Sequence, residues 1–244
     1  MVKQAQKDQE LVFGVNSIVE LLKAKRRKIY NIYTTKPFPK AWNDVSKLLP
    51  SYVNIKYVTK DDLNKLAQTS DHQGIVAFAS PFQFRKKPFE TKNNKFLVML
   101  DSIQDPRNLG AILRSAYCTG IDGVILTQKG SSPITATALK ASAGLAEHLE
   151  IYLAPSALSV AQELKKNGYS IFVTTLQKSQ SAVNIDFKLP LCVVIGSEGE
   201  GVSKNMLSIG QNITLPQRSP DISYNASVAS GILLFWIATK NKLI

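Results

Sequence analysis

The chain has 244 residues, enough for one large domain or two modest ones. Its composition, 44% hydrophobic and 20% charged, is that of a globular protein, and no apolar run is long enough to span a membrane. The two cysteines lie far apart and the first residues contain no apolar signal core, so we expect a cytoplasmic protein without disulfides or a bound metal.

The net charge of +12 is concentrated in the first 100 residues, which hold 18 Lys and Arg against 8 Asp and Glu. Such an asymmetry favours a polyanionic partner, most often a nucleic acid; a charge that serves only solubility is the alternative. Because phosphates bind cations and bases stack on rings, a basic run beside Tyr30 and Tyr33 is a candidate RNA contact, with a solvated turn as the alternative. The run consists of Lys25, Arg26, Arg27 and Lys28.

The first part of the chain alternates short strands with helices. Residues 1–10 are expected to form a disordered tail. The patterns predict strands at 11–14, 29–33, 54–58 and 74–79, and helices at 15–23, 41–49 and 61–67. These elements predict a small α/β domain over residues 11–80, followed by a proline-containing linker at 81–95.

Residues 96–244 alternate again and predict a second α/β domain with a mostly parallel sheet and helices on both faces. The predicted strands lie at 96–100, 123–127, 151–153, 170–176, 191–195 and 213–215. The predicted helices begin near 108, 135, 156 and 225, and the second of them runs to 148.

The first informative stretch is 101–116, where a buried strand runs into a helix. Asn108 stands where an N-cap is expected, and Arg114 follows on the first turns. Ligands of open α/β sheets bind beyond the carboxyl ends of the strands, so both side chains are candidates for one cleft. A capped helix with a solvated arginine explains the same residues.

The second stretch, Gly196 to Gly201, is a loop with three glycines and two glutamates after an apolar strand. Glycines let a ligand approach the backbone closely. The spacing matches neither a dinucleotide fingerprint nor a P-loop, and the carboxylates would repel phosphates. A ligand with hydroxyls, an amine or a sulfonium suits the loop; a plain turn is the alternative.

The third stretch begins at Leu215-Pro216 and continues through a polar loop to a helix near Asn225 with small residues on its first turns. Small residues let a ligand or another helix approach. The alternative is an ordinary C-terminal helix with its apolar residues on a core face. Those residues are Ile232, Leu233, Phe235 and Trp236.

Together the three stretches resemble the SpoU (TrmH-type) branch of the SPOUT RNA 2′-O-methyltransferases. The Asn-x-Gly-x-x-x-Arg motif is met at 108–114, the Gly-x-Glu-x-x-Gly loop at 196–201, and the Pro-spacer-Asn-x-Ser-x-Ala motif at 216–229. Residues 11–80 resemble the substrate-binding domain of the large-subunit rRNA guanosine-2′-O-methyltransferase group. The third motif departs from the usual family residues at Gln217, Ser219, Tyr224 and Ala226.

The resemblance implies transfer of a methyl group from S-adenosylmethionine to the ribose of a guanosine in large-subunit ribosomal RNA, hence a role in rRNA processing. It also implies a homodimer and a C-terminal trefoil knot. A tRNA target and a non-catalytic RNA-binding protein are the alternatives. Arg114 would act at the hydroxyl, Asn108, Glu198 and Asn225 would shape the pocket, and Ser223 would contact RNA. The implied cofactor-binding residues are Thr174, Thr175, Leu176, Gly196, Gly201, Leu215, Tyr224 and Ala226.

Overall fold

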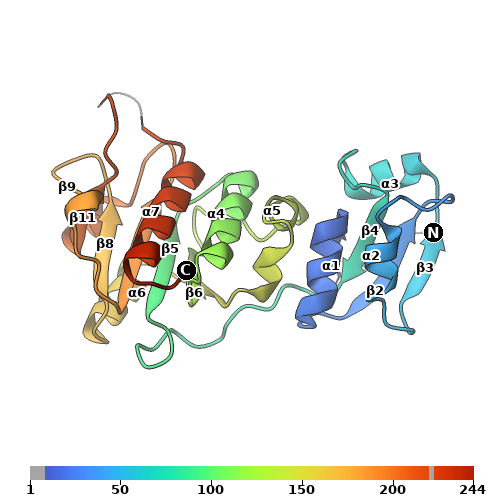
Figure 1. Cartoon of the computed structure of the whole chain (residues 1–244), viewed down its shortest axis with the longest axis horizontal. Helices are drawn as coiled ribbons and strands as arrows, with labels where there is room; N and C mark the ends of the chain where they lie inside the picture. Colours follow the sequence, from blue (N-terminus) through green and yellow to red (C-terminus); the bar gives the residue numbers. More distant parts are fainter. Residues whose placement is uncertain (1–8, 220–222) are drawn as a thin grey trace. The chain divides into compact units, whose positions relative to one another are not determined.

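The computed structural model describes residues 9–219 and 223–244 of the chain (Figure 1). These residues form two compact units. The first unit contains the described residues up to Gln83 together with Ile134–His148, and the second contains Phe84–Pro133 and Leu149–Ile244. Most of the predicted tail at 1–10 lies outside the described residues, and its last residue, Glu10, already belongs to the first strand.

The first unit is built on a mixed sheet with the strand order β1-β4-β2-β3 among its described residues. Strands β2 and β3 pair in parallel, and the other pairs are antiparallel. Helix α3 begins at a capping box in which Thr59 and Asp62 exchange hydrogen bonds. The elements are β1 (Glu10–Phe13), α1 (Val15–Ala24), β2 (Ile29–Thr34), α2 (Trp42–Ser46), β3 (Asn54–Tyr57), α3 (Lys60–Ala67) and β4 (Ile75–Ala79).

The predicted helix at 135–148 is wrong in its length and in its placement. The chain forms the short helix α5 (Ala136–Ala141) and then the 3-10 helix η1 (Leu145–His148), because Ala143 and Gly144 adopt positive φ angles of 53° and 82°. Both helices belong to the first unit and pack against α1, which the local sequence pattern does not indicate.

A buried ion pair fixes η1 within the first unit. The Arg27 guanidinium lies 2.8 Å from the Glu147 carboxylate and 2.9 Å from that of Glu10, and the Arg27 side chain is fully buried. Burial raises the pKa of the Glu147 carboxyl, and the adjacent guanidinium opposes that shift. Arg27, one of the predicted RNA contacts, is therefore withdrawn from the surface that a phosphate could reach.

The second unit contains a seven-stranded sheet within its described residues, in the order β7-β6-β5-β10-β8-β11-β9, and every pair in it is parallel. This confirms the predicted mostly parallel sheet. Its elements are β5 (Phe96–Asp101), α4 (Pro106–Cys118), β6 (Gly123–Thr127), β7 (Ile151–Ala154), α6 (Ala157–Lys166), β8 (Ser170–Thr174), β9 (Gln180–Ser181), η2 (Ala182–Asn184), β10 (Leu191–Gly196), η3 (Lys204–Ser208), β11 (Gln211–Thr214) and α7 (Ala226–Lys240).

The central strands of this sheet are buried along their whole length, as expected for parallel strands covered on both faces. Leu97 and Met99 of β5 pack with the apolar face of α6 in one core cluster. No residue of α4 or α7 belongs to that cluster. These two helices pack against each other (Figure 1), and α7 also contacts β10. The sheet is thereby sandwiched between helices.

The predicted N-cap of α4 is wrong, and the alternative interpretation of α7 fails in part. Asp105 rather than Asn108 caps α4: its carboxylate accepts a hydrogen bond from the Arg107 amide, and Pro106 occupies the first helical position. Ile232 and Phe235 of α7 are 43% and 57% exposed instead of facing the core. The helix is apolar around most of its circumference, so its pattern does not single out one buried face.

Candidate active site

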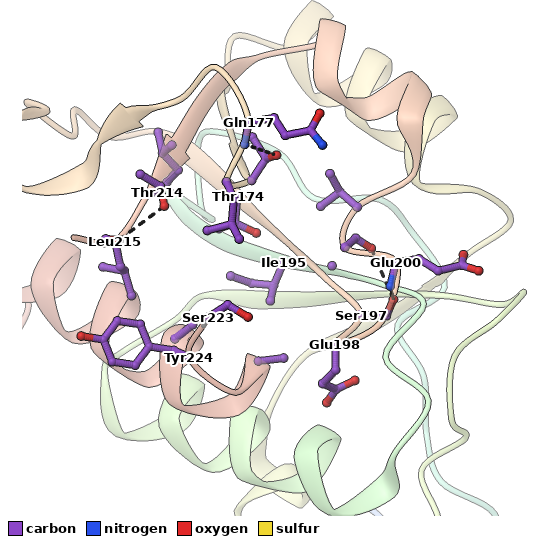
Figure 2. A pocket seen from close by; sticks show the side chains of 18 of the residues that line it. Thr174, Gln177, Ile195, Ser197, Glu198, Glu200, Thr214, Leu215, Ser223 and Tyr224 are labelled. Carbon is purple, nitrogen blue, oxygen red and sulfur yellow. Dashed lines mark hydrogen bonds between the residues drawn. The ribbon is translucent and has the colours of Figure 1, made fainter. Parts of the chain in front are cut away.

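Three loops meet beyond the carboxyl ends of β8, β10 and β11, which are neighbours in the sheet. They enclose a cavity of about 520 Å³, within the usual size range of small-molecule sites (Figure 2). The place agrees with the rule that ligands of open α/β sheets bind at this edge. Predicted site residues that line it are Thr174, Thr175, Leu176, Gly196, Glu198, Gly201, Leu215, Ser223, Tyr224 and Ala226.

The loop after β10 closes on itself directly behind the strand. The backbone amides of Ser197 and Gly201 each donate to the other residue's carbonyl oxygen, both at 3.0 Å. A Cβ on Gly196 would lie 2.1 Å from the Gly201 carbonyl carbon and 2.2 Å from the Val202 nitrogen. Since both atoms belong to the backbone, this position admits only glycine in the present loop conformation.

Asp101, at the end of β5, ties this loop to the neighbouring strand. Its carboxylate is buried and accepts hydrogen bonds from the Ser203 amide at 2.8 Å and from the Ser203 hydroxyl at 2.6 Å. The Ser102 hydroxyl donates to its other oxygen at 3.3 Å. Asp101 was not among the predicted site residues; the signal for it was a carboxylate at the end of an otherwise apolar strand.

A chain of polar contacts links the three sequence stretches. The Asn108 side-chain amide donates to the Glu198 carboxylate, and the Asn225 amide donates to the Asn108 oxygen at 3.3 Å. Asn225 in turn caps α7, accepting from the amides of Ser227 and Val228. Asn108, Glu198 and Asn225 are thus held together although α4, the loop after β10 and α7 are far apart in sequence.

Arg114 does not join these three residues. It is exposed on α4, six residues after Asn108 and therefore about 9 Å further along the helix axis. It does not line the cavity, and within the described part of the chain it forms no hydrogen bond or ion pair. If Arg114 acts on a substrate bound in this cavity of the same chain, the substrate must extend from the cavity to Arg114.

The sequence missed several residues that line the cavity. Gln177 follows directly after the predicted strand at 170–176, and Ile195 is the last apolar residue before Gly196. Lys204 adds a cation to a lining that also contains two carboxylates, Glu198 and Glu200. The cavity therefore offers apolar walls, backbone groups and both signs of charge, which suits a zwitterionic or polar organic molecule. The described residues hold no group of His, Cys, Asp and Glu side chains that could bind a metal ion.

Comparison with known families accounts for both units. Residues 95–235 match the model of the SpoU rRNA methylase family, and residues 11–85 match that for RNA 2′-O ribose methyltransferase substrate binding. The chain belongs to the SpoU rRNA methylase family. It is accordingly an RNA methyltransferase, and the family resemblance expected from the three motifs is confirmed.

Relatives of the same family cover nearly the whole chain. YacO of Bacillus subtilis, assigned to the TrmH family of tRNA/rRNA methyltransferases, is 30% identical over 242 residues, which are 96% of each chain. A TrmH-family protein of Staphylococcus aureus is 34% identical over 193 residues, 76% of this chain and 77% of its own. Similarity over this length includes both units.

Solved structures share the fold at lower identity. An RNA 2′-O ribose methyltransferase superposes with a TM-score of 0.84 at 20% identity, covering 97% of this chain and 90% of that one. The SpoU methyltransferase AviRb from Streptomyces viridochromogenes, in complex with AdoMet, gives 0.80 at 18% identity, covering 97% and 92%. The predicted SpoU-type α/β fold is confirmed.

In the first unit of this SpoU-family chain, three of the four predicted RNA contacts lie on the surface. Lys25, Arg26 and Lys28 are exposed, whereas Arg27 is buried in its ion pair. Ser223, the other predicted RNA contact, lines the cavity of the second unit and is exposed. No helix among the described residues is both long and apolar enough to cross a bilayer.

Proposed function

We propose that the protein transfers a methyl group from S-adenosylmethionine to the 2′-hydroxyl of a ribose in RNA. The observation that carries the proposal is the cavity at the ends of β8, β10 and β11, with Asn108, Glu198 and Asn225 joined beside it. Membership in a family of rRNA methylases and the match of residues 11–85 to a ribose methyltransferase substrate-binding model support ribose as the acceptor.

The cavity fits the cofactor in size and in chemistry. A β-carbon would fill the position of Gly196, so the loop presents backbone groups there rather than a side chain. Thr174–Leu176, Gly196–Gly201 and Leu215–Ala226 would hold the molecule, with the carboxylates of Glu198 and Glu200 near its positive charges. S-adenosylmethionine, when bound, supplies the electrophilic methyl group.

The chain itself must position the ribose and assist loss of its proton. A hydroxyl is a poor nucleophile, so its proton must be removed or the developing alkoxide stabilised. We assign this task to Arg114, which either gives a proton transiently to a neighbouring RNA phosphate and then accepts the proton of the hydroxyl, or remains charged and stabilises the developing alkoxide. Asn108, Glu198 and Asn225 would orient the nucleotide and the methyl donor for in-line attack.

The basic first unit would bind the RNA through phosphates, with Lys25, Arg26 and Lys28 contributing. We propose a guanosine of large-subunit ribosomal RNA as the target, with a tRNA ribose as the alternative. The support is the resemblance of the first unit to the rRNA guanosine-2′-O-methyltransferase group. Both cysteines are free thiols, consistent with action in the reducing cytoplasm.

We also propose a homodimer and a C-terminal knot. Val228, Ile232 and Phe235 expose apolar surface on one stretch of α7, between 43% and 57% each, and a second copy would cover it. Such an interface would lie beside α4, which packs on α7, and could bring Arg114 to the partner's substrate. The trefoil knot rests on the family resemblance alone.

The test is methyl transfer from radiolabelled S-adenosylmethionine to separate transcripts of large-subunit rRNA and of tRNA. Label in rRNA supports the proposal, and label in tRNA alone selects the alternative. Binding of RNA without transfer to either substrate would favour a non-catalytic RNA-binding protein. Calorimetric titration with S-adenosylmethionine provides an independent measure of the cofactor site.

A further inference from the structure

Three aromatic residues of the first unit form a surface cluster that none of the motifs includes. The Phe38 ring stacks on the Trp42 ring with centroids 4.9 Å apart and planes 8° from parallel. The Tyr57 ring meets Phe38 edge-on at 5.8 Å. Phe38 and Tyr57 are 45% and 49% exposed, whereas Trp42 beneath them is buried. We call Phe38, Trp42 and Tyr57 the aromatic platform.

The platform is fixed by backbone contacts on either side. Phe38 stands between two prolines, which restrict its backbone, and the Trp42 amide donates to the Pro39 carbonyl at 2.9 Å. Tyr57 lies on β3 opposite Thr34 of β2, and the Val58 amide donates to the Thr34 carbonyl at 2.9 Å. A ligand stacking here would meet rings that are already ordered, so little conformational entropy would be lost on binding.

The surroundings of the platform are cationic. The Lys36 ammonium lies 4.0 Å from the centroid of the Tyr57 ring. Residues 35–60 carry five lysines and a single carboxylate, Asp44. Exposed rings beside lysines combine a stacking surface with cations for phosphates, the pairing that proteins use on single-stranded nucleic acid.

We propose that the aromatic platform binds unpaired bases of the substrate RNA by stacking. The proposal rests on the proposed function and adds the kind of RNA that the first unit selects. In a duplex the base faces are stacked on one another, so exposed rings can reach only bases splayed from a loop, bulge or single strand. Lys36 would contact the adjacent phosphate while Phe38 and Tyr57 present their rings to the bases.

The test measures binding of the full-length protein to two fluorescent RNAs of equal length, one unstructured and one fully duplex, over a series of salt concentrations. Phe38→Leu and Tyr57→Leu remove one ring each and keep an apolar side chain. Phe38→Tyr retains the ring face. Leu48→Ala is the matched control, because Leu48 is also exposed on the first unit, at 40%, but is not aromatic.

Each leucine variant should bind the unstructured RNA roughly tenfold more weakly, as expected for loss of one base stack, with duplex binding within about twofold of wild type. The dependence of affinity on salt should not change, because no phosphate contact is lost. Phe38→Tyr and Leu48→Ala should bind like wild type. Thermal unfolding tests whether each variant is folded. If Phe38→Leu does not fold, binding by Tyr57→Leu tests the proposal.

Unchanged binding of unstructured RNA, or equal losses on both RNAs, would overturn the proposal. Weaker self-association in sedimentation with RNA binding intact would assign the platform to a protein contact and would also overturn it. Methyl transfer by the wild-type protein is measured in the same preparation. Absence of transfer refutes the proposed function, whereas transfer with platform-independent binding of unstructured RNA refutes only the platform.

Discussion

The side-chain amide of Asn108 donates a hydrogen bond to the Glu198 carboxylate, joining residues 90 positions apart in the chain. This contact connects the first turns of α4 to the glycine-rich loop after β10. The Asn225 side-chain amide donates to the Asn108 oxygen, so both the nitrogen and the oxygen of the Asn108 side chain form hydrogen bonds. The orientation of Glu198 beside the cavity therefore depends on two other elements of the second unit.

Loss of the Asn108–Glu198 contact should impair catalysis through a shared step. Asn108→Ala and Glu198→Ala are each expected to lower kcat/KM by about tenfold to a hundredfold, the range for a hydrogen bond to a charged group. The double variant should be little worse than the poorer single variant, because both changes remove one contact. Asn205→Ala, an exposed asparagine of η3 outside the cavity, is the control. Fully additive losses would show that the two residues act independently.

Gly196 should tolerate no side chain. Gly196→Ala places a Cβ against the backbone of Gly201 and Val202, so the loop must move, and affinity for S-adenosylmethionine should fall by at least about tenfold. Gly196→Val should abolish binding. Gly199→Ala in the same loop tests the effect of a methyl group that does not strain the backbone, since a Cβ there meets no protein atom within 4 Å although Gly199 lines the cavity. Titration calorimetry on folded proteins compares both variants with wild type; wild-type affinity of Gly196→Ala would move the cofactor elsewhere.

Arg114 is expected to act in the transition state. Arg114→Ala should slow methyl transfer by roughly 100-fold or more, the range for a positioned proton-transfer group or oxyanion donor, with less effect on RNA and cofactor binding. Arg114→Lys should restore little, because lysine lacks the planar guanidinium. Arg107→Ala, which removes another exposed arginine of α4, should keep near-wild-type rates. Single-turnover rates at saturating RNA and cofactor measure this, and a fast alanine variant would exclude Arg114 from the mechanism.

Arg27 and Lys25 should have separable roles despite their proximity in sequence. Arg27→Ala leaves the buried Glu147 without its partner and should destabilise the first unit by about 3 kcal/mol or more. Hydrogen exchange at β1 and η1 measures that loss. Lys25→Ala should leave exchange unchanged and reduce the salt dependence of RNA binding by about one phosphate contact. A folded Arg27→Ala protein with normal exchange but weakened RNA binding would restore Arg27 to the RNA surface.

The parts of the site that depend on local patterns were predictable from sequence. Apolar strands followed by Gly196–Gly201 and by Leu215–Ala226 indicate ligand loops, and described residues of both stretches line the cavity. The features that could not be predicted from sequence depend on contacts with residues far away in the chain. The burial of Arg27 requires Glu147, which is 120 residues away. The position of Asp101 requires Ser203, which is 102 residues away.

Local rules also competed with each other at the start of α4. Both Asn108 and Asp105 are good N-cap residues, and Pro106 decides for Asp105 because proline favours the first helical position. In α7 the pattern gives no answer, since apolar residues surround the helix and only tertiary packing selects Leu233 and Leu234 for burial. The exposed remainder is the surface that we assign to a second copy.

The chemical position of the new methyl group tests the central claim most directly. Ribosomal RNA methylated by the purified protein is digested to nucleosides, and the products are identified by mass spectrometry against synthetic standards. The account predicts a nucleoside methylated at the ribose 2′-oxygen, namely 2′-O-methylguanosine. A methyl group on a nucleobase, with none on ribose, would contradict it.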